Sequence, residues 1–386
     1  MKILIAPDSF KGSLSARDVA LNLREGIHRF SPEIQVELFP VADGGEGTCA
    51  AIVSAVGGEI VKRTVTGPNG DPVEAFFGIA GDMAIIEMAA ASGLALVSGN
   101  MRPLQAATYG TGELMLHALE AGCKRMILGI GGSATTDGGA GMAQALGVRL
   151  LAEDGSTLGR GGGELGKLSK VDVSQIDPRI NACKIIVATD VSNPLYGDNG
   201  CAVVYGPQKG CNEQDVALLD CNMQHYSRIL REQLGKDIAA VPGSGAAGGL
   251  GAGLLAFCGA TLKSGINTVL DAMDFDKHVS DADMVITGEG RIDFQSAFGK
   301  VPVGVSRRVK AIADVPVVAV VGSIGPGAEA VYEHGIAAIL SIIDKPMTLQ
   351  EAMKDTPALL ADAAERLMRI VQVGHTLMLK NEQHGC

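Results

Sequence analysis

The sequence predicts an α/β protein in which a doubly wound Rossmann/flavodoxin-like domain carries a second α/β domain inserted into it. Both ends of the chain alternate short apolar runs with stretches of helical apolar spacing, the pattern of a doubly wound sheet. The middle is rich in glycine, and the whole chain has 52 Gly in 386 residues, about twice the usual ~7%. This length suits two domains at roughly 100–200 residues each. We place residues 1–66 and 266–386 in the doubly wound domain and residues 67–265 in the inserted Gly-rich domain.

The elements follow from apolar periodicity and from turn residues. In the first part of the doubly wound domain we expect strands at 2–7, 36–41 and 60–65 and helices at 14–30 and 48–56. In the inserted domain we expect a hairpin at 73–80 and 84–88, strands at 126–130 and 184–189, a helix at 213–234 and a Gly-Ala helix after 243. In the last part we expect strands at 284–287, 315–321 and 336–343 and helices at 302–312 and 358–370.

Composition excludes several classes of protein. The net charge of −11 and the 4% aromatic content disfavour nucleic-acid binding, which needs a basic face or base-stacking side chains. No signal peptide precedes the first strand, and no apolar run is long enough to span a bilayer, so we expect a soluble cytoplasmic protein without a membrane partner. The eight cysteines contain no CxxC pair and are expected to be ordinary thiols.

Two polar loops follow predicted strands near the N-terminus. The first, from Asp8 to Ser13, contains Ser9 and Lys11, and lysine is a point charge for phosphate or carboxylate. The second contains Asp43 and Glu46 among three glycines, which suits a metal or hydroxyl contact. In open α/β sheets, ligands bind beyond the carboxyl ends of the strands, although a capping turn explains either loop alone.

A glycine-rich loop, GIGGSATTDGGAG at 129–141, follows another predicted strand and precedes a helical stretch. This order directs backbone N–H groups at phosphate. It lacks the Gly-Lys-[Ser/Thr] ending of a Walker A loop. We expect a nucleotide or phosphate site here formed by Gly131, Gly132, Ser133, Thr135, Asp137 and Gly138.

Two later strand ends carry further charged residues. Asp190 follows the strand at 184–189 and could orient a substrate hydroxyl, hold a metal or form an Asx turn. The segment from Thr287 to Lys300 contains Glu289, Arg291 and Asp293. Arginine is a bidentate clamp for carboxylate or phosphate, and a structural salt-bridge network is the alternative.

One further glycine motif is discounted. Residues 243–248 match GxGxxG, but they follow Val-Pro, and the acidic residue expected about twenty positions later is missing. Close packing of a helix is the simpler interpretation. Taken together, the loops of this sequence offer acidic side chains, cationic side chains and glycine backbone, but no Ser-His-Asp set. This combination suits phosphoryl transfer, in which positioning and charge neutralisation do most of the catalysis.

Eight segments together resemble the bacterial glycerate kinase family of the glycerate 2-kinase type, which acts in glyoxylate, glucarate and galactarate use. The resemblance runs from Met1 to about Ile343, and the last forty residues share less of it, so no chemistry is placed there. The segments are IAPDSFKGSLSA, VADGGEGT, IEMAAASGL, TYGTGEL, GIGGSATTDGGAGM, YGPQKG, AAGGLGAGL and TGEGRID..S..GK.P.GV.

The resemblance implies that ATP phosphorylates D-glycerate to 2-phosphoglycerate between two domains, with Mg²⁺ as cofactor. In the resulting hypothesis, Arg291, Lys300 and nearby Ser9 bind the glycerate carboxylate. Asp190 orients the attacking hydroxyl, with Asp8 and Asp293 as rivals. Lys11 neutralises the transferred phosphoryl group, and the loop at 131–139 cradles phosphate. Asp43 or Glu289 binds magnesium through water.

Three alternatives stay open. The chain could make 3-phosphoglycerate or act on another small hydroxy acid, or it could be a catalytically silent metabolite-binding protein of the same fold. A dinucleotide oxidoreductase is disfavoured by the missing fingerprint. The sequence leaves open whether the protein is a monomer or a homodimer.

Overall fold

The computed structural model describes residues 1–384 and divides the chain into two compact units. The first unit comprises residues 1–43 and 269–386, and the second comprises residues 44–268. The predicted first boundary at residue 66 therefore needs correction. Strand β3 (Glu59–Thr66) pairs antiparallel with β4 (Pro72–Ala80) in the second unit's sheet, and alternating side chains alone cannot show which sheet a strand joins.

The first unit contains a five-stranded sheet in the order β15-β13-β11-β1-β2, and every neighbouring pair is parallel. Counted along this unit, the order is 2-1-3-4-5, that of a flavodoxin-like doubly wound sheet. The prediction of a doubly wound α/β domain is confirmed. The strands are β1 (Lys2–Pro7), β2 (Gln35–Leu38), β11 (Met284–Gly288), β13 (Val317–Val321) and β15 (Ile336–Ser341).

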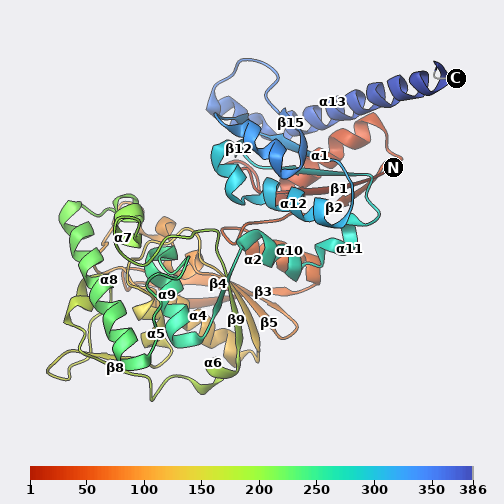
Figure 1. Ribbon diagram of the computed structural model, residues 1–386. Coiled ribbons are helices and arrows are strands. Elements are labelled where there is room, and N and C mark those ends of the chain that lie inside the picture. Colours follow the sequence, from red (N-terminus) through yellow and green to blue (C-terminus); the bar gives the residue numbers. More distant parts are fainter. Residues whose placement is uncertain (385–386) are drawn as a thin grey trace. The chain divides into compact units, whose positions relative to one another are not determined.

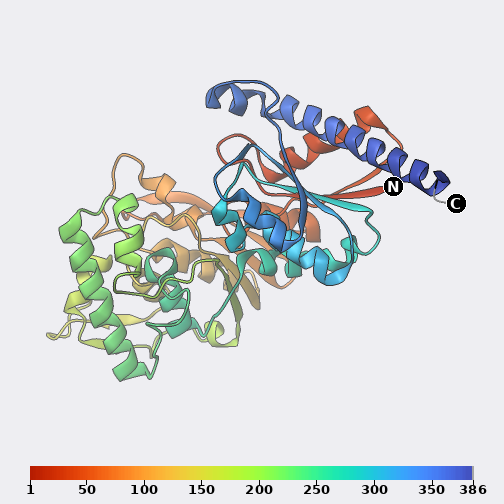
Figure 2. The same cartoon turned by 45° about the horizontal axis from the view of Figure 1, so that its top comes forward.

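Helices cover both faces of this sheet, which is why its central strands are buried along their whole length. Helices α1 and α13 lie together on one face, packed on alternate strand residues such as Ile3, Ile5 and Val318 (Figures 1 and 2). The unit's helices are α1 (Ala16–Phe30), part of α10 (Gly265–Ala272), α11 (Phe275–Val279), α12 (Val301–Ile312) and α13 (Leu349–His384). A small parallel pair joins β12 (Arg291–Ile292) and β14 (Ser323–Ile324).

Helix α13 is much longer than the predicted 358–370, and Pro357 lies inside it. Proline normally ends or kinks a helix, because it lacks an N–H and its ring crowds the preceding turn. The sequence pattern therefore placed the start of the helix after Pro357. The Met353 carbonyl, four residues before Pro357, instead accepts a hydrogen bond from the Ser13 hydroxyl. Ser13 also bonds Thr356, so the loop before α1 holds the segment before the proline in the same helix.

The second unit contains a six-stranded mixed sheet in the order β10-β9-β6-β5-β4-β3. The pairs from β10 to β5 are parallel, and β4 and β3 complete the edge as antiparallel strands. The predicted hairpin at 73–80 and 84–88 is confirmed as β4 and β5. The remaining strands of this sheet are β5 (Met83–Glu87), β6 (Arg125–Gly129), β9 (Lys184–Ala188) and β10 (Thr261–Lys263). A separate antiparallel pair joins β7 (Arg149–Leu151) and β8 (Lys170–Asp172).

Helix α2 also belongs to the second unit. Gly78 of β4 leaves the space that Val53 and Cys49 of α2 fill, while its neighbour Phe77 points into the main core on the other face of the strand. The helices of this unit are α2 (Thr48–Val56), α3 (Ala89–Ser92), α4 (Tyr109–Glu120), α5 (Ala140–Ala145), α6 (Pro178–Ala182), α7 (Cys201–Tyr205), α8 (Glu213–Leu234) and α9 (Ala246–Cys258). Within residues 1–384, no helix combines the length and the apolar character needed to cross a membrane.

Candidate active site

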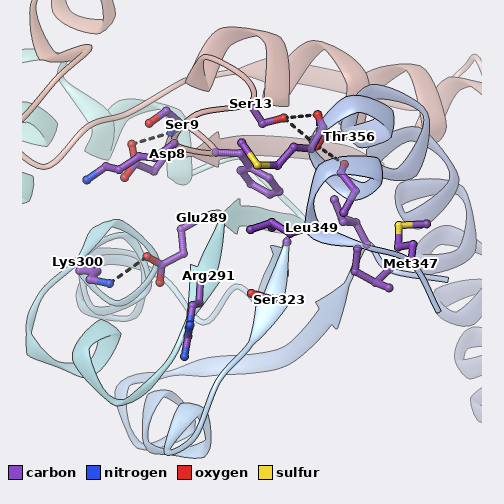
Figure 3. Close-up of a pocket in the computed structure, with 18 of the residues that line it drawn as sticks. Asp8, Ser9, Ser13, Glu289, Arg291, Lys300, Ser323, Met347, Leu349 and Thr356 are labelled. Atoms are coloured by element: carbon purple, nitrogen blue, oxygen red, sulfur yellow. Dashed lines mark hydrogen bonds and ion pairs between the residues drawn. The ribbon is translucent and has the colours of Figure 1, made fainter. Parts of the chain in front are cut away.

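A cavity of about 570 Å³ opens at the carboxyl ends of the first unit's central strands (Figure 3). Its lining comes from the loops after β1, β2, β11, β13 and β15, from the residue before α12 and from the first turns of α13. In the sheet, β2 lies on one side of β1, and β11, the next strand of this unit along the chain, lies on the other side. The strand order therefore reverses between β1 and β11. Doubly wound proteins bind ligands at this position.

Carboxylates from three loops line one side of the cavity: Asp8 after β1, Asp43 after β2 and Glu289 after β11. Asp8 is buried, and one of its oxygens accepts a hydrogen bond of 2.7 Å from the Ser9 N–H. Burial raises the pKa of Asp8 to about 7, and the negative charges of Asp43 and Glu289 add to this effect. An acid with a pKa near neutrality is suited to accept a proton at physiological pH.

Glu289 contacts two side chains of its own segment. Its carboxylate accepts a hydrogen bond of 2.5 Å from the Ser296 hydroxyl and lies 3.6 Å from Lys300 Nζ. Burial raises its pKa, while the Ser296 hydrogen bond and the Lys300 charge act in the opposite direction. The negative charge of Glu289 therefore partly neutralises the Lys300 ammonium group.

The predicted cations also line the cavity: Lys11, Arg291 and Lys300. Lys300 is the residue before α12, and no side chain caps the free N–H groups of that helix. A helix N-terminus carries partial positive charge, so it adds to the Lys300 ammonium in attracting an anion. The structure thus brings Asp8, Ser9, Lys11, Asp43, Glu289, Arg291 and Lys300 to one cavity.

Asp293 is the predicted acid of this segment that does not line the cavity. Its carboxylate lies 3.3 Å from Arg291 Nε and accepts a hydrogen bond from the Gln295 N–H. These contacts orient the arginine and begin the short 3₁₀ turn η4 (Phe294–Phe298). A direct catalytic role for Asp293, one of the rivals named from the sequence, finds no support in this position.

The opposite side of the cavity is apolar and comes from a part of the chain where the sequence placed no chemistry. Leu349 and Met353 stand at 75% and 37% exposure on the first turns of α13. Figure 3 shows the charged groups on one side and Met347, Leu349 and Thr356 on the other. The apolar lining consists of Ile342, Ile343, Met347, Leu349, Ala352 and Met353.

Hydrogen bonds join this apolar side to the lysine loop. The Ser13 hydroxyl contacts the Met353 carbonyl and the Thr356 hydroxyl, each at 2.8 Å. The adjacent Gly12 has a φ of +78° and lies against Met353, a conformation that glycine adopts readily. Ser15, rather than Ser13, caps α1. The start of α13 therefore helps to fix the loop that carries Lys11.

In the second unit, the predicted glycine-rich loop lies at the carboxyl end of β6. Gly131 and Gly132 are exposed, but the chain from Ser133 onward turns into the core. Asp137 is fully buried and accepts hydrogen bonds from the N–H groups of Gly139 and Gly141 and from both the N–H and the hydroxyl of Thr108. Burial raises its pKa. These bonds order the loop from inside, and direct phosphate contact is not available to Asp137.

The other buried members of the loop have structural neighbours as well. Lys209 is 2% exposed and donates to the Ser133 hydroxyl at 2.8 Å and to the Thr135 carbonyl at 2.6 Å. Burial lowers the pKa of Lys209 to about 8. Gly138 packs against the Tyr226 ring. The part of the predicted phosphate cradle that faces solvent is therefore limited to Gly131 and Gly132.

The discounted GxGxxG segment is confirmed as a packing feature. A Cβ on Gly248 would lie 1.9 Å from the Thr135 carbonyl oxygen, and one on Gly245 would lie 2.1 Å from the Pro194 carbonyl oxygen. Ala247 has a positive φ of 54° and, with the two glycines that follow, kinks the start of α9. These glycines allow the backbone at the start of α9 to pack closely against the backbone of the glycine-rich loop and of Pro194.

Asp190 follows β9 in the second unit and is exposed. One of its oxygens accepts a hydrogen bond of 2.9 Å from the Gly265 N–H. The bond fixes the end of β9 to the segment after β10. The predicted role of Asp190 in orienting a substrate hydroxyl stays a prediction.

The acids of the cavity have the oxygen donors that magnesium prefers. Within residues 1–384, no group of three or more His, Cys, Asp or Glu side chains converges to hold a metal ion by itself. Magnesium in phosphoryl-transfer enzymes is typically held by one or two carboxylates together with substrate phosphates and water. Asp43 and Glu289 provide oxygen donors of this kind in one cavity.

A doubly wound sheet with acids and cations at its switch point is typical of an α/β enzyme that acts on a small molecule. Comparison with known proteins makes this specific. The sequence model of the Glycerate kinase family matches residues 3–372. The chain belongs to this family and is an enzyme of the phosphotransferase class.

Individual relatives agree along nearly the whole chain. Glycerate kinase of Halalkalibacterium halodurans is 53% identical over 368 residues, covering 95% of this chain and 97% of that protein. Glycerate 2-kinase of Escherichia coli K12 is 48% identical over 377 residues, covering 97% and 99%. A crystal structure of a candidate glycerate kinase 2 from Salmonella typhimurium LT2 superposes with a TM-score of 0.88 at 45% identity, covering 97% and 99%.

Proposed function

We propose that this protein transfers the γ-phosphoryl group of ATP to D-glycerate and releases 2-phosphoglycerate and ADP. The observation that carries the proposal is the cavity at the β1/β11 switch point, where acids and cations from separate loops meet, in a chain of the glycerate kinase family. The similarity to the Escherichia coli protein named glycerate 2-kinase supports the 2-phosphate as product.

Binding of glycerate is assigned to the cations. Arg291, oriented by Asp293 at 3.3 Å, offers a planar donor pair for the substrate carboxylate. Lys300 and the uncapped N-terminus of α12 add positive charge beside it. Ser9 lines the same side of the cavity and can hydrogen-bond a glycerate oxygen.

We propose Asp8 as the group that accepts the proton of the attacking hydroxyl. It is buried in the cavity, and its pKa is raised to about 7, which matches a base working near neutral pH. Lys11, also in the cavity lining, neutralises charge on the transferred phosphoryl oxygens. Asp190, the first choice from the sequence, lies in the second unit and stays the rival. Gly131 and Gly132 remain proposed phosphate contacts, and a reaction site shared by the two units stays a prediction.

Magnesium is assigned to Asp43 and Glu289, directly or through water. A bound divalent ion would supply positive charge that neutralises the phosphate oxygens during transfer. Asp43 and Glu289 both raise the pKa of Asp8 through their negative charge, so a cation between carboxylates and phosphate would also favour the ionised, proton-accepting form of Asp8.

The test is ADP release on addition of D-glycerate to enzyme, ATP and Mg²⁺, followed by coupling to enolase, which uses 2-phosphoglycerate directly. Activity with enolase coupling is the expected result. ADP release that reaches enolase only after phosphoglycerate mutase is added would show the 3-phosphate as product. A thermal shift with glycerate but without ADP release would identify a silent binding protein and overturn the proposal.

A further inference from the structure

We propose that the apolar side of this cavity, formed by residues 342–353, binds the base of the nucleotide. The inference rests on the proposed function, because it requires ATP as a substrate. It adds the location of the nucleoside end of ATP, on the first turns of α13 and in the first unit.

The size of the cavity motivates the inference. At about 570 Å³, it falls in the range of roughly 300–1,000 Å³ that encloses drug-sized ligands. A three-carbon acid held by Arg291 and Lys300 fills a small part of such a volume. The rest of the lining includes uncharged apolar side chains such as Ile343, Leu349 and Met353.

The chemistry of this side does not suit glycerate. Glycerate presents carboxylate and hydroxyl oxygens, whereas Leu349, Met353 and Ile343 offer only apolar contact. The nearby hydroxyls already have protein partners: Thr356 bonds the Ala352 carbonyl at 2.7 Å, and Thr348 bonds Glu351 at 2.8 Å. A flat base, with two apolar faces, gains from burial against such side chains.

The exposure of these side chains leaves apolar surface inside the cavity that a ligand can cover. Leu349 and Met353 are 75% and 37% exposed although both line the cavity. Methionine adapts its shape to a ligand because its chain is unbranched and polarisable, and both Met347 and Met353 line this side.

The two sides of the cavity together match the two ends of ATP. The hydrogen bonds of Ser13 to α13 place the apolar side next to the loop that carries Lys11. A nucleotide with its base on α13 would therefore direct its phosphates toward Lys11 and toward the acids assigned to magnesium. The strand-end position is the one at which doubly wound proteins bind nucleotides.

The experiment compares Ala352→Leu with Ala358→Leu. Ala352 lines the cavity, so leucine there fills the proposed base site without deleting a core side chain. Ala358 is exposed on the same helix and does not line the cavity, which makes it the matched control. Calorimetry would measure binding of ATP, adenosine, tripolyphosphate and D-glycerate.

For Ala352→Leu we expect binding of ATP and adenosine to weaken at least tenfold, with tripolyphosphate and D-glycerate unchanged and with Ala358→Leu behaving like the parent. A second variant, Leu349→Ser, removes apolar contact at an exposed position and should weaken ATP binding roughly fivefold or more. Unchanged ATP binding in both variants, or a loss confined to D-glycerate, would overturn the assignment. The parent enzyme distinguishes this failure from that of the proposed function: if it binds ATP as expected but releases no ADP with D-glycerate, the kinase activity fails and the base site stands.

Discussion

Replacing Asp8 with Asn tests the raised pKa and the catalytic assignment at once. Asn has the shape of the protonated carboxyl group and keeps an oxygen that can accept the Ser9 N–H bond. The variant should lose activity because it cannot accept a proton, with kcat lower by about 10²–10⁴. It should also be more stable than the parent at alkaline pH.

The sign and size of the stability change follow from the pKa. In the folded chain the pKa of Asp8 is raised from 3.8 to about 7, chiefly by burial and then by the charge of Asp43. Ionised Asp8 therefore destabilises the fold. This effect is absent below about pH 4, grows between pH 4 and 7 and is constant above pH 7. At about 1.4 kcal/mol per pH unit it reaches at most roughly 4 kcal/mol.

Urea unfolding at pH 5 and pH 8 is the assay for this prediction. The advantage of Asp8→Asn over the parent should increase by roughly 1–3 kcal/mol between these two pH values. In the parent, kcat/KM should fall as the pH drops through about 7. Asp314→Asn, at a residue with 99% side-chain exposure, is the control and should change neither quantity. A variant destabilised equally at both pH values, or one with normal turnover, would refute the reasoning.

Three further variants test other parts of the structure. Lys11→Met removes an exposed cation of the cavity and should lower kcat/KM at least about 100-fold, with an unchanged melting temperature. A loss below fivefold would show that Lys11 has no role in phosphoryl transfer. Asp137→Asn places an amide group among N–H donors that bond a carboxylate in the parent and should destabilise the protein by about 2–4 kcal/mol in urea unfolding. Unchanged stability would contradict the role of Asp137 in ordering the glycine-rich loop. Gly248→Ala would bring a Cβ to 1.9 Å from a carbonyl oxygen at a φ of +65° and should lower the free energy of unfolding by about 3 kcal/mol or more. Gly197→Ala, at a positive φ but with open space around it, should lower it by only about 1 kcal/mol. Equal losses in the two variants would show that backbone strain, not packing, sets the effect.

Local sequence patterns predicted the elements well where the apolar period was clear. Strand β1 and helices α2 and α8 have the predicted bounds. The patterns were less informative where an element depends on its neighbours. The strand at 59–66 has mostly exposed side chains, and its pairing with β4 decides its unit. Helix α13 continues through Pro357 because Ser13, far away in the sequence, bonds the Met353 carbonyl and the Thr356 hydroxyl in the turn before it.

The candidate site shows the same division. The sequence predicted Asp8, Lys11, Glu289 and Arg291 as site residues, because each follows a strand whose carboxyl end lies at the ligand-binding edge of a parallel sheet, and the structure places all four in one cavity. It also predicted six residues of the glycine-rich loop as phosphate contacts, of which Gly131 and Gly132 are exposed. Glycine and hydroxyl residues suit both a phosphate cradle and tight internal packing, and only the contacts of Asp137 with Thr108 show which one applies.

By itself, the sequence determined the family, the doubly wound class of the first unit and the charged residues at its strand ends. These properties depend on local period, turn chemistry and motif wording, which are read along the chain. The tertiary structure alone decided that residues 342–353 line the same cavity as Asp8 and Lys11, that Asp293 supports Arg291 and that Asp8 has a pKa near 7. The cavity and the pKa of Asp8 depend on distance and burial between segments far apart in the chain, and the Arg291–Asp293 contact depends on how two neighbouring side chains are oriented; no local pattern encodes either.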